Sequence, residues 1–272
     1  MRFLQYDVPV GASLLKRHLD MPEALEDYIG HGFTHFEYKM SVEGKNYRNS
    51  AEMLEMLEQF NARLWKHGLR PWSLHLPPAN MSSPNEDERR EISQLYQRII
   101  AHVSGWGINV LTMHTDYPPA SPEERPVRCL QAVKSIREVR DCAAVYGMRL
   151  AVEDLPRNLL GNCSRELYGL ISAAGGVGCC FDVNHLFRES HEEFMKRMGR
   201  FVITTHISDC DDTDEKHWLP GQGRVPFRTV MDTLQSMGYR GPYLFEVRKK
   251  EDGSSYTAEE ILGGFRRALE KE

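Results

Sequence analysis

The sequence lacks the features of a membrane-spanning or exported protein. None of its apolar runs approaches the roughly 18 residues that a membrane span requires. Its N-terminal stretch, MRFLQYDVPVGASLLKRHLD, lacks the continuous apolar segment of a signal peptide. Its 6 cysteines have no paired, metal-type spacing, and a chain of 272 residues can fold without disulfides. We therefore expect a cytoplasmic protein with free thiols and no membrane association.

An excess of basic residues and a modular organisation are also absent. The chain carries 34 Lys and Arg against 39 Asp and Glu, and its formal net charge of −5 gives no global attraction to nucleic acid or anionic lipid. No Pro/Gly/Ser-rich linker or low-complexity tract interrupts it. The length fits one large α/β barrel or two smaller domains. The absence of a linker favours a single domain over residues 1–272.

What the sequence does contain is a regular alternation of short β-rich runs and longer amphipathic runs. Two of the amphipathic runs, residues 50–68 and 127–147, end in Gly, as helices commonly do. In the first of them the apolar residues repeat at helical spacing: Met53, Leu54, Leu57, Phe60 and Leu64. The β-rich runs are residues 2–8, 33–39, 71–77, 109–115, 148–154, 177–183, 201–208 and 242–248.

Eight strands alternating with helices predict a single (β/α)8 TIM barrel. The alternative is an open, doubly wound sheet, which binds dinucleotides through a glycine-rich loop after its first strand. No such loop follows residues 2–8. We therefore favour the barrel and expect no nucleotide cofactor.

Acidic residues and histidines stand near the ends of seven of the predicted strands. Successive members are separated by 38, 39, 39, 29, 24 and 40 residues, which is one for each strand–helix unit. In a closed barrel the C-terminal strand ends converge on one mouth, where barrel enzymes place their active sites. One such residue alone is more often a solvated strand terminus, so the prediction depends on the whole set: Glu37, His75, His114, Glu153, Asp182, His206 and Glu246.

The stretch LAVEDLPRN, residues 150–158, indicates which way these side chains point. Side chains of a strand alternate between its two faces, so Glu153 shares a face with Ala151. Counting back by two from Asp182, His206 and Glu246 likewise reaches small or apolar residues that suit the interior of a barrel. We therefore expect Glu153 to point into the mouth.

Three acids and a histidine brought together would repel one another unless a cation neutralised them, because buried carboxylates are costly unless they are paired or bound to metal. One divalent cation held by the side chains of four successive strands would remove that cost. Mixed oxygen and nitrogen ligation suits Mn, Mg, Zn, Fe or Co and does not choose among them. The predicted ligands are Glu153, Asp182, His206 and Glu246.

Four motifs resemble those of the xylose isomerase-like, or sugar phosphate isomerase/epimerase, superfamily of TIM barrels. They are LAVEDLP, CCFDVNH, THISDCDDTDEKHWLPGQGRVPF and YLFEVR. The resemblance extends over essentially the whole chain and is strongest from Leu150 onward. The superfamily includes ketose 3-epimerases, inosose-type isomerases and dehydratases, and the type-IV apurinic-site endonucleases. The chain departs from the usual pattern at Gln222, where an acidic residue is common, and at Val225 to Phe227.

The resemblance implies a role for most of the strand-end residues. In the epimerases a Glu–Asp–His–Glu set binds one divalent metal, and the two glutamates, here Glu153 and Glu246, are the acid/base pair. One carboxylate takes a proton from the carbon next to a carbonyl, and the other returns a proton through a metal-stabilised enediolate. Substrate hydroxyls would be held by residues of the mouth: His185, His75, His114, His217 and Glu37.

Three alternatives stay open at this stage. A non-catalytic barrel that keeps the ligands only for binding is disfavoured, because both acid/base carboxylates are present. A lyase or dehydratase that uses the same enediolate chemistry cannot be separated by these motifs. An abasic-site endonuclease uses three zinc ions, and the chain has counterparts for the extra ligands: His75, His114, His185, His217 and Glu215. The acidic balance argues against the nuclease, because DNA affinity comes largely from Lys and Arg that neutralise phosphates.

We therefore predict a divalent-metal-dependent sugar, sugar phosphate or polyol isomerase or epimerase. Its partner is a small carbohydrate, and a nucleic-acid partner is not favoured. The sequence fixes neither the metal, nor the sugar and its phosphorylation, nor the oligomeric state, and a homo-oligomer is compatible with it.

Overall fold

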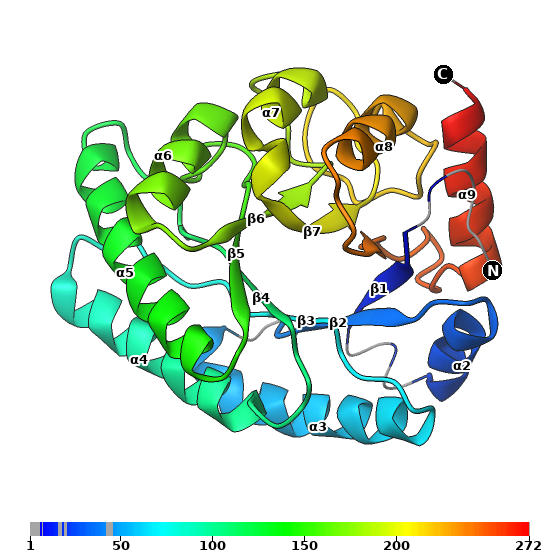
Figure 1. Cartoon of the computed structure of the whole chain (residues 1–272), viewed down its shortest axis with the longest axis horizontal. Helices are drawn as coiled ribbons and strands as arrows, with labels where there is room; N and C mark the ends of the chain where they lie inside the picture. Colours follow the sequence, from blue (N-terminus) through cyan, green and yellow to red (C-terminus); the bar gives the residue numbers. More distant parts are fainter. Residues whose placement is uncertain (1–5, 7, 16–17, 19–20, 42–45, 272) are drawn as a thin grey trace.

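Eight parallel strands close into a barrel in the order β1-β2-β3-β4-β5-β6-β7-β8 (Figure 1). The structure is a computed structural model that describes residues 6, 8–15, 18, 21–41 and 46–271. The predicted TIM barrel is therefore confirmed, and the open-sheet alternative is excluded. The strands are β1 (Val10–Leu14), β2 (His35–Lys39), β3 (Ser73–His75), β4 (Val110–Met113), β5 (Arg149–Glu153), β6 (Gly178–Asp182), β7 (Val202–Ile207) and β8 (Tyr243–Phe245).

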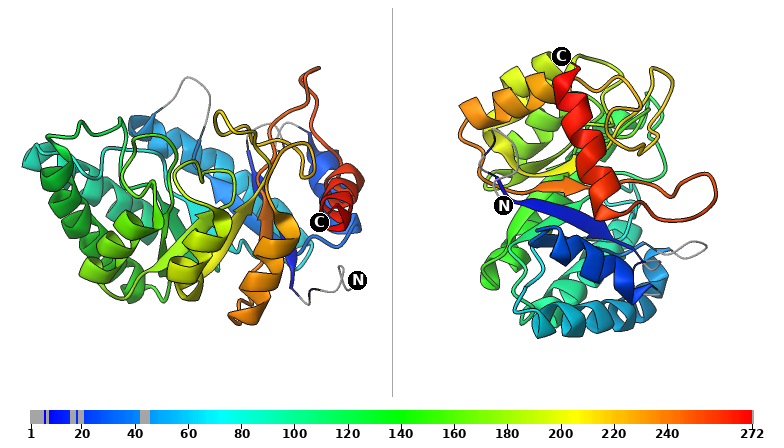
Figure 2. Two further views of the ribbon diagram at one scale, coloured as in Figure 1. Left: turned by 90° about the horizontal axis from the view of Figure 1, so that it is seen from above. Right: turned by 90° about the vertical axis from the view of Figure 1, so that its right-hand side faces the viewer.

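Helices surround the barrel and cover the outer face of its strands. They are α2 (Pro22–Gly30), α3 (Ser50–Lys66), α4 (Glu86–Val103), α5 (Arg125–Val145), α6 (Ser164–Ala174), α7 (His191–Met198), α8 (Phe227–Ser236) and α9 (Ala258–Glu270), with the short 3-10 helices η1 (Tyr47–Asn49) and η2 (Gly199–Phe201). The ring of helices closes where α9 meets α2, because the amide of Ala258 donates to Asp27 Oδ2 at 2.6 Å. Figure 2 shows these two helices side by side.

The prediction of the first strand was wrong. The strand is Val10–Leu14, whereas Tyr6 and Val8, from the predicted run 2–8, are not in a strand, and the rest of that run lies outside the described residues. The true strand, VGASL, has weak β propensity because of its small residues. Packing requires them: a Cβ on Gly11 would lie 2.0 Å from the carbonyl oxygen of His35 on β2.

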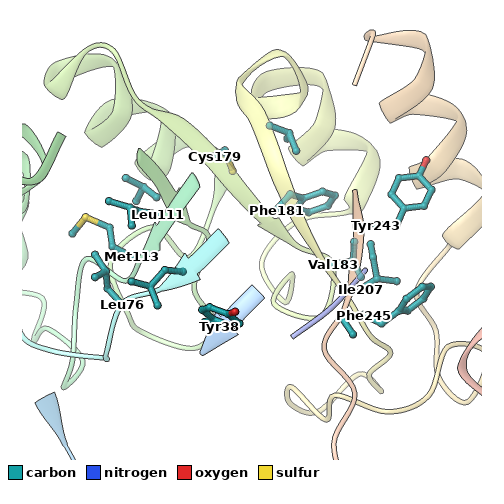
Figure 3. Packing of buried hydrophobic residues seen from close by; sticks show 14 of the residues in the cluster. Tyr38, Leu76, Leu111, Met113, Cys179, Phe181, Val183, Ile207, Tyr243 and Phe245 are labelled. Atoms are coloured by element: carbon teal, nitrogen blue, oxygen red, sulfur yellow. The ribbon is translucent and has the colours of Figure 1, made fainter. Parts of the chain in front are cut away.

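Alternation along the strands separates two kinds of packing. Outward-facing side chains, including Phe181, Ile207 and Phe245, join the large apolar layer beneath the helices (Figure 3). A small separate cluster of Val110, Ala151 and Cys180 fills the inside of the barrel. The predicted inward direction of Ala151 and Cys180 is thereby confirmed, and the same parity carries Glu153 and Asp182 toward the mouth.

The amphipathic prediction for residues 50–68 is also confirmed. Helix α3 buries Met53, Leu57, Phe60 and Leu64 on one side and ends at Lys66, just before the predicted terminus. Within the residues that the structure describes, no helix is long and apolar enough to cross a bilayer. The connections after β7 and β8 project from the same end of the barrel (Figure 2), and this end carries the strand-end acids and histidines.

Candidate active site

The four predicted ligands lie on neighbouring strands at one end of the barrel. Glu153 and Asp182 are the last residues of β5 and β6, His206 is the penultimate residue of β7, and Glu246 directly follows β8. The parallel register pairs Asp182 with His206. All four side chains are buried, and Glu246 is the most exposed of them at 8%.

These side chains converge on one atom of His206. Its Nδ1 lies 3.0 Å from Glu153 Oε1, 3.2 Å from Glu246 Oε2 and 3.8 Å from Asp182 Oδ2. Two of these oxygens, Asp182 Oδ2 and Glu246 Oε2, are buried without a hydrogen-bond partner. Buried carboxylate oxygens are costly unless paired or metal-bound. Three carboxylates and one imidazole nitrogen around a common point fit a divalent cation with mixed oxygen and nitrogen ligands.

The charged side chains of the site shift one another's pKa values. Burial would raise the pKa of Glu153, but the neighbouring His206 and His114 outweigh it and hold this pKa well below its ordinary value. Burial likewise opposes charge on Glu246, and Lys39 and His206 nevertheless lower its pKa. The pKa of Asp182 is raised, because burial dominates there. Glu153 and Glu246 are thus held as anions. At Asp182 the neighbouring histidines do not offset the cost of burying a negative charge.

The second oxygen of Glu153 is held by two histidines. His75 Nε2 and His114 Nε2 lie 2.9 Å and 3.0 Å from Glu153 Oε2. His75 is fully buried, whereas His114 is partly exposed and borders the mouth. Desolvation lowers the pKa of His114 despite the nearby carboxylate.

Glu37 lies deeper in the barrel, beneath His206. Its Oε1 is 2.9 Å from His206 Nε2 and accepts a hydrogen bond from Ser13 on β1 at 3.0 Å. Its Oε2 accepts from Ser73 on β3 at 2.9 Å and from Thr112 on β4 at 3.4 Å. This fully buried carboxylate lies against the ring of His206, whose Nε2 is buried without a hydrogen-bond partner of its own.

His185 and His217, the remaining residues predicted to contact the substrate, also line the mouth of the barrel. His185 Nε2 lies 2.9 Å from Glu215 Oε2 and 3.4 Å from Asp182 Oδ2. The imidazole of His185 lowers the pKa of Glu215 to about 2 despite the opposing effect of burial. His217 has a φ of 49°, which is rare for a residue with a side chain, and its Nδ1 lies 3.2 Å from the carbonyl oxygen of Glu246.

Two further trios of potential ligands flank the convergence point. The first, the His75 group, consists of His75, His114 and Glu153. The second, the His185 group, consists of Asp182, His185 and His217. The ligand atoms within each trio lie within 4.8 Å of one another. Each of these groups is a candidate site for an additional cation.

Lys39 at the end of β2 is a site residue that the sequence predictions missed. Its ammonium forms an ion pair with Glu246 Oε1. Burial would lower the pKa of Lys39, but the carboxylates of Glu246 and Glu153 outweigh burial and raise this pKa. A signal was present in the run FTHFEYK, because residue 39 shares a strand face with Glu37.

A cavity of about 250 Å³ opens over this cluster. Its polar lining includes Lys39, His114, Glu153, His185, His217 and Glu246. The loop after β5 supplies apolar walls through Leu155, Pro156 and Leu159. A larger hollow of about 680 Å³ between α6 and α7 contains none of the strand-end residues. We assign the chemistry to the smaller cavity because the buried acids and histidines line it.

Comparisons with known sequences agree with this architecture. The family model described as "Xylose isomerase-like TIM barrel" matches residues 26–267. An uncharacterized protein of Methanocaldococcus jannaschii, MJ1311, is 24% identical over 272 aligned residues, which cover 94% of this chain and 88% of that protein. The D-psicose 3-epimerase of Ruminiclostridium cellulolyticum is 23% identical, over 63% of this chain and 61% of its own.

Solved structures share the fold across nearly the whole chain. A D-tagatose 3-epimerase-like protein superposes with a TM-score of 0.79 at 19% identity, covering 97% of this chain and 99% of that one. The IOLI protein, solved with a binding zinc atom, gives a TM-score of 0.75 at 17% identity with the same coverage. At these identities the likeness concerns the fold of the backbone.

Proposed function

The chain belongs to the family of xylose isomerase-like TIM barrels, and we propose that it is a divalent-metal-dependent isomerase or epimerase of sugars. The proposal concerns carbohydrates because relatives such as the D-psicose 3-epimerase of Ruminiclostridium cellulolyticum act on them by name. Its reaction removes a proton from the carbon next to a carbonyl and returns a proton to the resulting enediolate.

The observation that carries the proposal is the convergence of ligand atoms at His206 Nδ1. Three carboxylate oxygens approach this atom within 3.8 Å, and two of them have no hydrogen-bond partner. We propose that one divalent cation is held there by Glu153, Asp182, His206 and Glu246. When bound, such a cation supplies a Lewis acid that stabilises negative charge developing on the sugar oxygens.

Glu153 and Glu246 are the proposed acid/base pair. Each turns one oxygen toward His206 and the other away from it: Glu153 Oε2 toward His75 and His114, and Glu246 Oε1 toward Lys39. The outward oxygens are the atoms proposed to exchange protons with the substrate. Since both carboxylates line the cavity, one could take a proton from one face of the carbon and the other could return it to the opposite face.

The surrounding residues orient this pair and the sugar. Glu37 is proposed to fix the ring of His206, since it is buried below the cavity and contacts that ring. His75 and His114 hold Glu153 Oε2. His185 and His217 border the cavity and are proposed to hold substrate hydroxyls.

The test is incubation of the metal-loaded protein in deuterated water with a panel of free and phosphorylated ketoses. Proton transfer through the pair requires deuterium to appear at one carbon of the true substrate, and NMR would identify both the carbon and the product. The metal-free protein is the first control. Asp182→Asn, which keeps the shape of one ligand but removes its charge, is the second.

Deuterium at one carbon together with an inverted centre identifies an epimerase, and an aldose product identifies an isomerase. Loss of water from the sugar would instead assign the chain to the dehydratases. If no sugar of the panel exchanges a proton while the loaded protein cleaves duplex DNA at an abasic site, the proposed function is wrong.

A further inference from the structure

Among the residues that the structure describes, the lysine and arginine side chains that line the active-site cavity are Lys39 and Arg157. The side chain of Lys39 is only 17% exposed, and the accessible part faces the cavity that Glu153 and Glu246 also line. Arg157, the other lining cation, is 50% exposed and is already paired with Asp214 and Glu215. Lys39 is therefore the lining cation that is placed to contact a small ligand bound beside Glu246.

The hydrogen-bonding capacity of Lys39 is incompletely used. An ammonium has three N–H donors. Among the residues that the structure describes, Glu246 Oε1 is the acceptor that Lys39 contacts. A buried donor without an acceptor is costly. The cavity beside Nζ is where a further acceptor can be supplied, and sugar oxygens are acceptors.

The position of Lys39 relative to Glu246 determines which sugar oxygen it would meet. Glu246 Oε2 faces His206 and is the proposed metal ligand, so Oε1, which accepts from Lys39, is the oxygen left to take a proton from the substrate. The carbon that loses this proton must lie against Oε1 for the transfer to occur. An ammonium already in contact with Oε1 is then within hydrogen-bond reach of an oxygen on that carbon or its neighbour.

We propose that Lys39 is a further catalytic residue, which donates a hydrogen bond to the substrate oxygen that becomes negatively charged as Glu246 Oε1 takes the proton. This inference rests on the proposed function. The C–H bond breaks, its proton forms an O–H bond with Glu246, and its electron pair moves into the carbonyl group to give the enediolate. Lys39 keeps all its protons.

Lys39 performs this role without moving. Before the transfer its charge balances the carboxylate of Glu246. After the transfer Glu246 is neutral, the negative charge lies on the neighbouring substrate oxygen, and the same ammonium balances it. A fixed charge that serves both states needs no reorganisation during the reaction, which is the condition for effective electrostatic catalysis.

The test compares two inhibitors bound to metal-loaded protein, together with the rate of deuterium exchange. D-Erythronohydroxamate mimics an enediolate through its planar hydroxamate group, which is anionic when it binds a divalent cation, and D-glucitol is a neutral polyol. In Lys39→Met the exchange rate constant should fall by about 10²–10³-fold, the loss expected when an oxyanion donor is removed. Hydroxamate affinity should fall by about 100-fold, whereas the glucitol affinity and the KM of a neutral ketose stay within about threefold.

Two further variants separate this role from a structural one. Lys39→Arg keeps the positive charge and should recover at least about tenfold of the lost rate. Lys250→Met removes a lysine that pairs with Glu260 outside the cavity, and it should leave both inhibitors and the rate unchanged. Thermal melts of all variants report whether they fold.

The inference is overturned if Lys39→Met exchanges protons at the wild-type rate, or if it loses hydroxamate and glucitol affinity equally. Either result leaves the proposed function intact, because the wild type still exchanges deuterium. If the wild type neither exchanges deuterium nor binds the hydroxamate, the proposed function fails, and the role of Lys39 fails with it.

Discussion

At the scale of single residues, the two glutamates proposed as the acid/base pair have different surroundings. Glu246 Oε1 contacts one full positive charge on Lys39, whereas Glu153 Oε2 lies between two imidazoles. Different surroundings give two carboxylates different basicities, which is how one site supplies both an acid and a base. We therefore expect the two glutamates to have separate roles in the proposed reaction.

Replacing either glutamate by its amide should remove catalysis while sparing the fold. In Glu246→Gln the outward oxygen position can no longer take a proton, so deuterium exchange should fall by about 10³-fold or more. The circular dichroism spectrum should match that of the wild type. Glu251→Gln, which changes an exposed carboxylate on the loop after β8, is the matched control and should keep full activity. An active Glu246→Gln enzyme would contradict the assignment.

Cation binding should release protons. Burial opposes the imidazolium form of His206, but Cys180 and the carboxylates of Glu37, Glu153 and Glu246 outweigh burial and raise the pKa of His206 well above 6.5. A metal ligand must be deprotonated, so the cation displaces this proton and the apparent affinity rises with pH up to the raised pKa. Calorimetric titration with zinc in two buffers of different ionisation enthalpy measures the released protons. Equal heats in both buffers would contradict this expectation.

Much of the site could be predicted from the sequence because strand parity and topology determine it. Glu153, Asp182, His206 and Glu246 each lie at or next to the end of a strand. A barrel brings strand ends together whatever their separation in sequence. Lys39 was missed because a lysine at a strand end is usually solvated. The carboxylate that pairs with it lies 207 residues away, and no local pattern identifies such a partner.

At the scale of elements, β1 illustrates how packing overrides propensity. The run 2–8 has stronger β propensity than the strand VGASL, yet the barrel uses the latter. The reason is steric: a Cβ on Gly11 would lie 2.0 Å from the carbonyl oxygen of His35 and 2.6 Å from Leu244 Cδ2. Small residues are therefore required where β1 fits between β2 and β8, and sequence periodicity does not report such contacts.

Gly11→Ala should consequently destabilise the barrel. The added methyl group must push β1 away from β2, and we expect the free energy of unfolding to fall by about 3 kcal/mol or more. Gly169→Ala on α6 is the matched control, because its Cβ would meet no atom within 4 Å. That change should raise the free energy of unfolding by up to about 1 kcal/mol. Urea denaturation measures both, and a neutral Gly11→Ala would refute the steric account.

At the scale of the whole molecule, the barrel was predicted from the alternation of eight strands with helices together with the absence of a glycine-rich loop after the first predicted strand. The prediction succeeded because a parallel strand pair needs a crossover, which produces the alternation of strands and helices, and because eight such units are the number that closes a TIM barrel. The sequence left the number of cations open, because the same histidines that surround Glu153 and Asp182 also form the His75 and His185 groups. Whether these histidines bind further cations depends on the orientation of their side chains, which strand topology does not determine.

The stability of the whole chain should depend on pH through His191, at the start of α7. Burial lowers the pKa of His191 to about 4, whereas an unfolded histidine has a value near 6.5. The folded state therefore binds fewer protons between these values. The contribution of His191 is fully present above pH 6.5 and decreases as the pH falls toward 4. From pH 7 to pH 5 this group should remove about 2 kcal/mol of the free energy of unfolding.

Urea denaturation of wild type and His191→Gln at both pH values isolates this contribution. The variant should lose about 2 kcal/mol less than the wild type over the interval. His102→Gln, which changes an exposed histidine on α4, should follow the wild type. Parallel pH profiles for wild type and His191→Gln would show that His191 is not buried in the neutral form.

The most direct test of the account is anomalous diffraction from crystals of the zinc-loaded protein. We expect one peak per chain, at about 2.0–2.2 Å from ligand atoms of Glu153, Asp182, His206 and Glu246. The account is contradicted if no cation occupies that point, or if cations bind at the His75 and His185 groups instead.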